Sequence, residues 1–488
     1  MTDTDARLAD LIGSLDTKHG ILAGRWIGAE TTFPVHDPAT GEQIAEVSDG
    51  AAAEAAAAVD AAASAFPAWA ATPPRQRAEV LRTVFELILG SIDDLAPLIS
   101  LENGKSLPDA RAEVAYAAEF FRWFSEEAVR SEGDYTSSPA GGTRTIVTHQ
   151  PVGVSALVTP WNFPAAMATR KIAPALAAGC TAVLKPAAET PLTALAIARL
   201  LQQAGVPDGV VNVVPTTDPG TVVSSWLADE RVRKISFTGS TAVGQHLLRQ
   251  AAARVLNASM ELGGNAPFVV TADADLPAAV AGAMVAKFRN GGQACTAANR
   301  FYVHADVAEE FTRRFGEAIG ALRVGPALAG DHQIGPMISA GAAGKVAALV
   351  EDAVAAGARI AHQAAAPLDG GFYPPTLLVD VPGDARVVRE EIFGPVAPVV
   401  SWTDEAEMLR QVNDTEMGLV AYVYAGRLQD ALRLAESIEA GMVGVNRGLV
   451  SDPATPFGGV KQSGLGREGA REGLREFQET RYFSVDWS

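Results

Sequence analysis

Cysteine is almost absent from this chain of 488 residues, which contains only Cys180 and Cys295. Two cysteines cannot form the disulfide framework of a small secreted protein, and their scarcity favours a reducing compartment. The N-terminal MTDTDARLADLIG has early acids and no basic segment before an apolar one, so we expect no signal peptide. The apolar stretch 172–184 is interrupted by Pro174 and Gly179 and is too short to cross a bilayer. Together these absences predict a cytoplasmic protein.

Positive charge is also scarce, with 39 Lys and Arg against 57 Asp and Glu and a net charge of −18. A surface of this sign repels nucleic acids and anionic membranes, so we expect neither as a partner. An anionic substrate would need a local cluster of basic side chains. The seven histidines are scattered without metal-ligand spacing, and we predict no metal site.

The length of the chain predicts two or three domains, and 48% hydrophobic with 20% charged residues is typical of a globular protein. Residues 51–71 look repetitive, but alanine is the best helix former and apolar residues recur there at helical spacing. We therefore predict an amphipathic helix over 51–71. Further helices are predicted over 81–98 and 110–129, with a turn at 137–142 before a strand at 143–150.

From residue 151 onward, short apolar runs alternate with helical segments, and a second series of this kind starts near residue 257. Such alternation is typical of βαβ units and a parallel sheet, and it predicts an α/β fold. The tail TRYFSVDW, 480–487, predicts an isolated strand with nothing after it to pair with. Such an edge is usually covered, often by another subunit.

Cys295 stands in the segment NGGQACTAANR, 290–300. A free cysteine is usually buried as a small apolar group, and Cys180 in AAGCTAVL fits that description. Around Cys295 the glycines permit close approach of a ligand, and backbone N–H groups could lower the pKa of the thiol or hold an oxyanion. The local sequence leaves a catalytic and a structural role equally open.

Glu261 in SMELGGN, 259–265, lies between two apolar residues and before a Gly-Gly turn. A single glutamate is usually a solvated surface group. This pattern instead indicates a partly buried carboxylate at a strand end, where burial raises the pKa and suits the group to general-base catalysis. Taken alone, the pattern is a weak indication.

The segment FTGSTAVG, 237–244, predicts a strand that ends at Thr238 and a helix that begins near Ser240. The free N–H groups at such a helix start suit the pyrophosphate of a dinucleotide. The spacing is not G-x-G-x-x-G, so it does not establish the usual Rossmann geometry. The segment NGKS, 103–106, is not a P-loop, because Ile99 occupies the place of the first glycine.

Seven segments, in order and in register, resemble the aldehyde dehydrogenase superfamily. One such motif carries little information, but seven are specific, and the resemblance extends from about residue 30 to the C-terminus. Within the superfamily the sequence is most similar to succinate-semialdehyde dehydrogenases. The segments are TPWNFP (159–164), VLKP (183–186), FTGST (237–241), MELGGNAP (260–267), GGQAC (291–295), EEIFGPV (390–396) and PFGGVKQSGLGREG (456–469).

The resemblance implies a chemical route and roles for four residues. Cys295 is the nucleophile that adds to an aldehyde, and Asn162 together with the Cys295 backbone N–H holds the oxyanion of the thiohemiacetal. After hydride transfer to the nicotinamide, Glu261 activates the water that hydrolyses the thioester. Lys171 is placed close to Asn162 and the proton-transfer route. A non-catalytic structural or binding protein on the same fold is the alternative from another class.

The resemblance also implies an NAD(P) site, in which Lys185 contacts the adenosine ribose, Ser240 the pyrophosphate and Glu391 the nicotinamide ribose. NAD-preferring relatives often have a glutamate three positions after that lysine, whereas here the position is Ala188 and the glutamate is Glu189. A 2′-phosphate then meets less repulsion and can pair with Lys185, so we expect NADP, with NAD as the alternative. The predicted cofactor residues are Thr159, Trp161, Asn162, Lys185, Ala188, Gly239, Ser240, Leu262, Glu391 and Phe393.

For the substrate, the resemblance implies that Arg170, Arg289 and Ser451 hold a distal carboxylate. Arg289 precedes Cys295 by six positions and Arg170 follows Asn162 by eight, so both are expected near the catalytic mouth. Arginines in ordinary surface ion pairs are the alternative. Two arginines recognise an anion and not a chain length, so glutarate or 2-oxoglutarate semialdehyde, or a broader range of aldehydes, stays open. A phosphorylated substrate is less favoured, and Glu261 counts against transfer of the acyl group to CoA.

The resemblance implies three parts: a Rossmann-like NAD(P)-binding domain, a catalytic domain and a β oligomerisation element. In a homodimer or homotetramer the C-terminal strand extends the sheet of a neighbouring subunit. Many relatives have a second cysteine two positions after the nucleophile, but here that residue is Ala297, and we expect no redox-switch disulfide. The expected bounds are 1–132 with 151–256 for the cofactor domain, 257–450 for the catalytic domain, 133–150 with 476–488 for the oligomerisation element, and 451–475 for a return segment.

Overall fold

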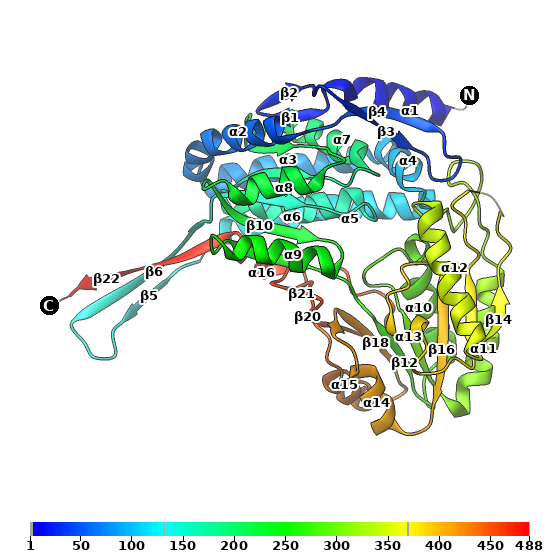
Figure 1. Cartoon of the computed structure of the whole chain (residues 1–488). Helices are drawn as coiled ribbons and strands as arrows, with labels where there is room; N and C mark the ends of the chain where they lie inside the picture. Colours follow the sequence, from blue (N-terminus) through cyan, green and yellow to red (C-terminus); the bar gives the residue numbers. More distant parts are fainter. Residues whose placement is uncertain (1–2, 131, 368–369, 488) are drawn as a thin grey trace.

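The computed structural model describes residues 3–130, 132–367 and 370–487. Two α/β bodies are built around separate sheets, and a narrow arm projects from the first body (Figure 1). This arrangement confirms the predicted α/β class. In the described parts of the chain, no helix is long and apolar enough to cross a membrane.

The first body contains an eight-stranded sheet with the order β2-β1-β9-β8-β7-β10-β11-β21. The five strands from β9 to β11 pair in parallel, as the βαβ pattern predicts. Their side chains are largely buried, because helices cover both faces of the sheet. The strands are β1 (Ile21–Ala23), β2 (Arg25–Ile27), β7 (Val154–Val158), β8 (Thr181–Lys185), β9 (Val211–Val213), β10 (Val232–Thr238), β11 (Asn257–Glu261) and β21 (Gly464–Leu465).

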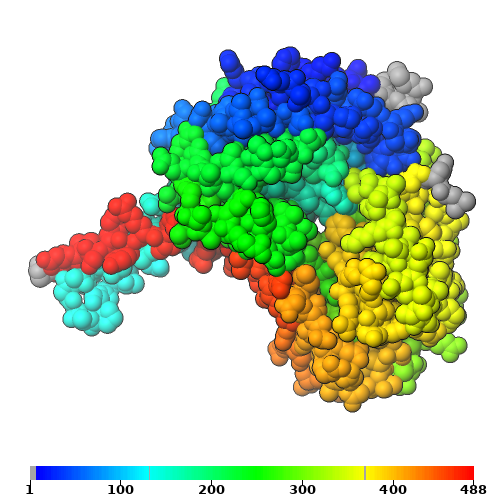
Figure 2. Space-filling view, viewed as in Figure 1, coloured from blue at the N-terminus to red at the C-terminus, as the bar shows by residue number. Residues whose placement is uncertain are grey.

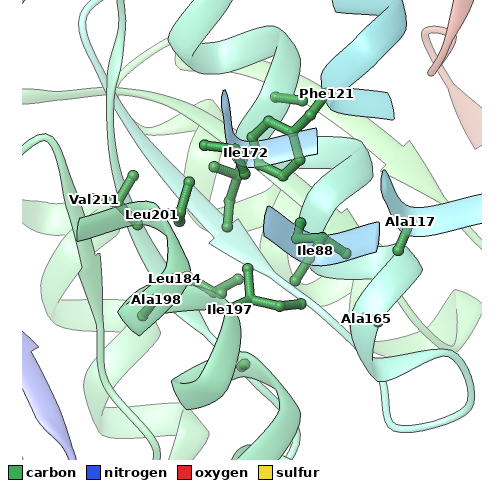
Figure 3. Packing of buried hydrophobic residues seen from close by; sticks show 14 of the residues in the cluster. Ile88, Ala117, Phe121, Ala165, Ile172, Leu184, Ile197, Ala198, Leu201 and Val211 are labelled. Atoms are coloured by element: carbon green, nitrogen blue, oxygen red, sulfur yellow. The ribbon is translucent and has the colours of Figure 1, made fainter. Parts of the chain in front are cut away.

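Successive strand residues point to opposite faces, so the two sides of this sheet have separate cores. On one side Leu184 packs with Ile88, Phe121, Ile172 and Ile197 of the helices (Figure 3). On the other side α2, α8 and α9 pack on alternate residues of β7 and β10. The helices are α2 (Ala52–Ala71), α3 (Pro74–Gly90), α4 (Ile92–Asn103), α5 (Leu107–Glu127), α6 (Pro164–Ala178), α7 (Pro191–Gln203), α8 (Pro219–Ala228), α9 (Thr241–Ala252) and α16 (Ala470–Arg475).

Two predictions for the helices have different outcomes. The helix predicted over 51–71 is confirmed as α2. The helical pattern predicted over 81–98 is confirmed, but it is divided between two helices, because α3 ends at Gly90 and α4 begins at Ile92. Glycine weakens a helix interior, and the acids Asp93 and Asp94 suit the positive end of a new helix. The apolar pattern continues across the break, which therefore leaves no sign in the periodicity.

The second body contains a seven-stranded sheet with the order β14-β15-β16-β13-β12-β18-β19, parallel except for β14 at one edge. Its strands are β12 (Pro267–Val270), β13 (Arg300–His304), β14 (Arg359–Gln363), β15 (Thr376–Val379), β16 (Val396–Trp402), β18 (Val420–Tyr424) and β19 (Met442–Val445). Its helices are α10 (Leu276–Phe288), α11 (Ala305–Gly320), α12 (Ala340–Ala355), α13 (Arg386–Arg389), α14 (Glu405–Asn413) and α15 (Leu428–Ser437). The shorter elements α1 (Asp3–Ser14), β3 (Thr32–His36), β4 (Gln43–Ser48), β17 (Met417–Gly418) and β20 (Val460–Lys461) lie outside the two large sheets.

The chain passes from the first sheet to the second between Glu261 and Pro267, since β11 ends at one residue and β12 begins at the other. The carboxyl ends of the first sheet's parallel strands therefore lie close to the amino end of the second sheet. Loops at the carboxyl edge of a parallel sheet are the usual place for a ligand site. The crossing thus brings two sets of loops to one location.

The arm is a three-stranded antiparallel sheet of β5 (Asp134–Ser137), β6 (Thr143–Pro151) and β22 (Gln478–Asp486), in the order β22-β6-β5. The prediction that the tail is an isolated strand is wrong, because β22 pairs with β6 along its whole length. Its partner, β6, comes much earlier in the chain, whereas the prediction considered only strands that could follow the tail. Figure 2 shows the arm projecting away from the compact part of the molecule.

Candidate active site

A cleft of about 280 Å³ lies where the two bodies meet. The first body contributes the loop after β7, the start of α9 and the segment after β11, and the second body contributes the loops around Cys295 and Glu391. Figure 2 shows the surface hollowed between the green and the yellow segments. The cleft is lined by Pro160, Trp161, Asn162, Met167, Thr238, Gly239, Ser240, Leu262, Gly263, Cys295, Ala342, Lys345, Glu391, Ile392 and Phe393.

Cys295 is half-buried in the loop between α10 and β13. The preceding 3-10 helix, Arg289–Gly292, contains Asn290 and Gly291 with positive φ, and a side chain at Gly292 would collide with the carbonyl oxygen of Gly394. These conformations bring the loop directly against Gly394, the residue after the Glu391–Phe393 segment. The glycines therefore permit a close approach, as the sequence indicates. The approach seen here is between two loops, whereas the sequence analysis expected it between this loop and a ligand.

The pKa of Cys295 is raised to about 12, mainly because burial disfavours the thiolate. The positive charges of Arg170 and Arg289 oppose this rise, while the carboxylates of Glu391 and Glu261 add to it. Any lowering of the pKa by backbone N–H groups is therefore outweighed by burial. The group is a neutral thiol near neutral pH and needs a base to become a nucleophile.

Glu261 is the last residue of β11 and is buried, as its apolar neighbours indicate. Burial raises its pKa well above the ordinary value, and the negative charge of Glu468 adds to this effect. Lys171, Arg170 and Arg467 oppose the rise. Its Oε2 atom has no hydrogen-bond partner among the described residues, so the carboxylate has acceptor capacity for a proton.

Asn162 is buried in the loop between β7 and α6. Its side-chain amide donates one hydrogen bond to the carbonyl oxygen of Gln293, at 3.1 Å, in the loop that carries Cys295. A primary amide has two N–H groups, so a second donor is available to an oxyanion on the substrate. The loop with the amide and the loop with the sulfur are therefore in direct contact.

Lys171 lies in α6, and its ammonium donates to Ser236 Oγ at 2.9 Å and to Glu468 Oε1 at 2.5 Å. Arg170, next to it, is 3.4 Å from the other oxygen of Glu468 and donates to the hydroxyl of Tyr116 at 2.5 Å. The buried carboxylate of Glu468 thus contacts both cations, and the charges of all three groups act on the pKa of Glu261. Sequence reasoning missed Glu468, although it lies inside the segment 456–469 that carries the resemblance.

The three residues predicted to bind a carboxylate line one small pocket together with Cys295. Arg170 is fully buried there with its guanidinium 4.1 Å from the centre of the Phe457 ring, whereas Arg289 is half-buried and 5.2 Å from the centre of the Phe163 ring. Among the described residues, Arg289 has no ion-pair partner. The pocket is lined by Tyr116, Phe163, Met167, Arg170, Arg289, Cys295, Thr296, Ser451 and Phe457.

Seven of the ten predicted cofactor residues line the cleft: Trp161, Asn162, Gly239, Ser240, Leu262, Glu391 and Phe393. Thr159, Lys185 and Ala188 do not line it. Thr159 N donates to the carbonyl oxygen of Lys185 at 3.1 Å, so both lie at the carboxyl edge of the first sheet, and Ala188 follows in the next loop. These three residues extend the site along the edge of the sheet.

Glu391 is half-buried, and loss of solvation raises its pKa to about 7, although the N–H of Gly264 and the charges of Lys345 and Lys287 oppose the rise. Lys345, on α12, lines the cleft and donates to the carbonyl oxygen of Glu391 at 3.5 Å. The ammonium of Lys287 is buried, and burial lowers its pKa to about 7. Nothing in the local sequence marks either lysine: Lys345 contacts Glu391 through tertiary packing, and Lys287 acts on it through its charge without a hydrogen bond.

The two cysteines differ as the sequence predicts. Cys180 is completely buried, and its sulfur lies 3.2 Å from the carbonyl oxygen of Phe477. Cys295 lines both the cleft and the small pocket. Within the ranges that the structure describes, no group of three or more His, Cys, Asp or Glu residues could hold a metal ion.

Comparison with known proteins identifies relatives along nearly the whole chain. Residues 26–483 match the aldehyde dehydrogenase family. The chain is 53% identical to a succinate-semialdehyde dehydrogenase of Paenarthrobacter nicotinovorans, covering 91% of this chain and 98% of the relative. It is 47% identical to the NADP(+) succinate-semialdehyde dehydrogenase of Escherichia coli strain K12, covering 97% and 98%. It is also 47% identical to a glutarate-semialdehyde dehydrogenase of Pseudomonas putida, covering 95% and 97%.

The fold agrees with these matches. A crystal structure of an aldehyde dehydrogenase from Brucella melitensis biovar abortus 2308 superposes with a TM-score of 0.95 at 47% identity, covering 97% of this chain and 98% of that one. The motifs, the fold and the cleft therefore lead to the same conclusion. The chain belongs to the aldehyde dehydrogenase family.

Proposed function

We propose that this protein oxidises succinate semialdehyde to succinate, with NADP as the hydride acceptor and with a covalent adduct on Cys295. The observation that carries the proposal is that Arg170, Arg289 and Ser451 share a pocket with Cys295. A four-carbon aldehyde with a distal carboxylate can place its aldehyde carbon at the sulfur of Cys295 and its carboxylate at the two arginines and Ser451. The relatives that carry this activity in their names support the same substrate.

Formation of the adduct starts with removal of the thiol proton of Cys295. Because its pKa is about 12, the proton has to go to a nearby base. Glu261 is a buried carboxylate whose charge acts on this thiol and whose Oε2 has no hydrogen-bond partner among the described residues. The sulfur then adds to the aldehyde carbon, and the oxygen becomes an oxyanion. The amide of Asn162 and the N–H of Cys295 stabilise that charge, which develops only along the reaction.

Loss of hydride from this tetrahedral adduct gives a thioester on Cys295. Glu261 then accepts a proton from water, hydroxide adds to the acyl carbon, and the Cys295 thiolate leaves with the carboxylic acid as product. Before that step Glu261 has to release the proton that it took from the thiol, and the Glu468 carboxylate, which accepts from Lys171, is the neighbouring group to which this proton can pass. The hydride that leaves the adduct carries two electrons, so the reaction requires a two-electron acceptor. A nicotinamide dinucleotide would act as this acceptor when bound.

The cleft fits such a cofactor on two grounds. The start of α9 has no side-chain cap at Ser240, so its backbone N–H groups are available to a pyrophosphate. Gly263 leaves space beside the Glu391 carboxylate, where an added Cβ would lie 3.1 Å from Oε2. Glu391 suits the hydroxyls of a ribose, and Trp161 with Phe393 forms an apolar wall for the nicotinamide end.

The preference for NADP rests on the loop after β8. Lys185 is buried, and burial lowers its pKa, an effect that the nearby Glu189 opposes. Ala188 leaves the position of the usual carboxylate uncharged, while Glu189 is exposed. A 2′-phosphate would therefore pair with Lys185 without a carboxylate at residue 188 to repel it.

Glutarate semialdehyde is the second candidate, because relatives of this chain carry that activity in their names. Its carboxylate lies one methylene farther from the aldehyde, and the same arginines would hold it. One methylene in such a pocket changes kcat/KM by about 10- to 200-fold, so the two substrates are separable by kinetics.

A substrate panel tests the proposal. Succinate semialdehyde, glutarate semialdehyde and butanal are each assayed with NADP and with NAD by following absorbance of the reduced cofactor. We expect the highest kcat/KM for succinate semialdehyde with NADP, and at least about tenfold less for butanal, which has no carboxylate to bind. Equal kcat/KM for butanal would refute carboxylate recognition, and a higher value for glutarate semialdehyde would favour the second candidate.

We propose further that the arm is an oligomerisation element. The outer edge of β22 pairs with no other strand in the described ranges, and large side chains on the arm are exposed: Tyr135, Tyr482, Phe483 and Trp487. An unpaired edge with apolar side chains favours pairing with another subunit. Deletion of residues 478–488 should convert a dimer or tetramer to smaller species in sedimentation velocity. A sedimentation coefficient equal to that of the full-length protein would contradict this role.

A further inference from the structure

The segment NGKS, 103–106, joins α4 to α5 and has no part in the route described above. Gly104 has a φ of +88°, and an added Cβ would lie 2.7 Å from a Pro336 side-chain carbon, so glycine permits this tight turn. The turn directs Lys105 into the interior, towards the loop that carries Asn162. Neither Lys105 nor its partner Glu113 lines the cleft or the small pocket, and the polar contacts of both side chains are to other protein groups.

Lys105 and Glu113 form an ion pair whose two side chains are both 0% exposed. The ammonium is 2.5 Å from Glu113 Oε2 and donates to the backbone oxygen of Asn162 at 2.7 Å. It also lies 4.0 Å from the centre of the Phe163 ring. A buried ion pair adds little net stability compared with apolar residues, so its presence here favours a positioning role over a purely stabilising one.

Glu113 holds the other end of the same loop. Its Oε1 atom accepts hydrogen bonds from the N–H groups of Ala165 and Ala166, at 2.9 and 3.2 Å, in the first turn of α6. Asn103 donates to the backbone oxygen of Trp161 at 3.0 Å. Polar contacts from 103–113 therefore reach residues on both sides of Asn162 as well as Asn162 itself.

The same segment also holds the loop of the nucleophile. Asp109, in the first turn of α5, accepts a hydrogen bond from the backbone N–H of Asn290 at 2.8 Å. The side chain of Asn290 donates to the backbone oxygen of Asn162 at 2.8 Å and to that of Gln293 at 3.0 Å. One rigid element, the start of α5, is thus connected to the loop of the oxyanion donor and to the loop of the sulfur.

From these contacts we infer that Lys105, paired with Glu113, is a positioning residue that orients the oxyanion-binding amide of Asn162 relative to Cys295. The backbone oxygen of Asn162 has two donors, Lys105 and Asn290, and loss of the first allows the peptide to rotate. Displacement of about 1 Å at a reacting centre can cost about 100-fold in rate. The inference rests on the proposed function, since it requires Asn162 to act on the oxyanion.

The test is a double-mutant cycle on the full-length enzyme. The paired variant Lys105→Met/Glu113→Gln removes both charges, so no unpaired charge is buried, and the amide oxygen of glutamine can still accept from Ala165 and Ala166. We expect kcat to fall by about 10- to 100-fold while KM for the aldehyde and for the cofactor stays within about twofold. In an Asn162→Ala background, the paired variant should lower kcat by less than about threefold, because the amide that it orients is already absent.

A matched control separates this effect from general destabilisation. Glu102 is equally buried and accepts hydrogen bonds from Leu192 N and Thr193 N at the start of α7, but no hydrogen bond joins it to residues 161–166. Glu102→Gln should lower the melting temperature and leave kcat within about twofold of the parent. If the paired variant does not fold, Asn103→Ala replaces it in the cycle, since it removes the contact to Trp161 without burying a charge.

Each outcome has a defined meaning. Equal fold losses in kcat with and without Asn162 would overturn the inference, because the pair would then act independently of the amide. So would an unchanged kcat in the paired variant. An Asn162→Ala enzyme with unchanged kcat would refute the oxyanion role itself and with it the proposed route. A strong loss in Asn162→Ala together with an additive cycle would refute the positioning role alone.

Discussion

Arg289 and Arg170 line the same pocket, but the structure predicts different kinetic consequences when each is replaced by methionine. Arg289 is half-buried and, among the described residues, has no carboxylate partner, so its guanidinium is available to a substrate. Arg170 is buried and already contacts Glu468 and Tyr116. Arg289→Met should therefore affect carboxylated substrates selectively, whereas Arg170→Met should weaken carboxylate binding and also lower turnover of aldehydes that have no carboxylate.

The magnitude follows from the interaction that Arg289 offers. A hydrogen bond to a charged group contributes about 1.5–3 kcal/mol, which corresponds to about 10- to 100-fold in KM. For Arg289→Met we expect KM for succinate semialdehyde to rise by this factor while kcat falls less than about threefold. Butanal has no carboxylate, so its kcat/KM should stay within about twofold and serves as the internal control.

For Arg170→Met the reasoning runs through Glu468. Without the guanidinium, the buried carboxylate retains Lys171 as its cationic partner, and Glu261 loses one of the charges that oppose its raised pKa. Turnover of butanal should then fall together with that of succinate semialdehyde. Steady-state kinetics with both aldehydes distinguishes the variants. Equal losses for both substrates in Arg289→Met would refute the assignment of Arg289 to the carboxylate.

Three further predictions concern the thiol, the base and the cofactor. Because the pKa of Cys295 is raised to about 12, its rate of alkylation by iodoacetamide without cofactor should rise about tenfold per pH unit between pH 7 and 10. A plateau in this rate below about pH 9 would contradict the prediction. Cys295→Ser should remove the labelling and serves as the control. Glu468→Gln removes a negative charge that raises the pKa of Glu261, so that pKa should fall and the acidic limb of the kcat profile should move to lower pH; movement to higher pH would contradict the reasoning. Ala188→Glu should lower kcat/KM for NADP by about tenfold or more through repulsion of the 2′-phosphate, with NAD changed less than about threefold, and equal effects on both cofactors would count against the placement of the adenosine end.

The sequence predicts best what depends on short-range order. The transition from β10 to α9 was expected after Thr238, and the structure confirms it, because a buried strand followed by Gly-Ser and an amphipathic pattern has a clear local signature. Burial of Glu261 at the end of β11 was predictable for the same reason. The carboxyl ends of parallel strands share an edge. Lys185 and Glu261 are the last residues of β8 and β11, and Asn162 and Ser240 follow β7 and β10, so all four lie at one side of the sheet.

Features that depend on tertiary contacts were not predictable. Glu468, Lys345 and Lys105 reach the site from segments distant in the chain, and the sign of the Cys295 pKa shift depends on total burial more than on its neighbours. The boundary expected after residue 256 falls inside the first sheet, because β11 pairs with β10. The apolar residues of β11 are compatible with either sheet, and only its pairing with β10 shows to which sheet it belongs.

The central claim is that an acyl group is held on Cys295 until water activated by Glu261 releases it. Glu261→Gln removes the base for both steps, so the thioester should form more slowly than in the parent and be hydrolysed more slowly still. About one equivalent of reduced cofactor should therefore appear as a slow burst before turnover falls by about 100- to 10,000-fold. Acid quenching at the end of the burst, followed by peptide mass spectrometry, measures this directly. The account predicts a succinyl group on the peptide that contains Cys295. An unmodified peptide, or a succinyl group on another residue with turnover intact, would contradict it.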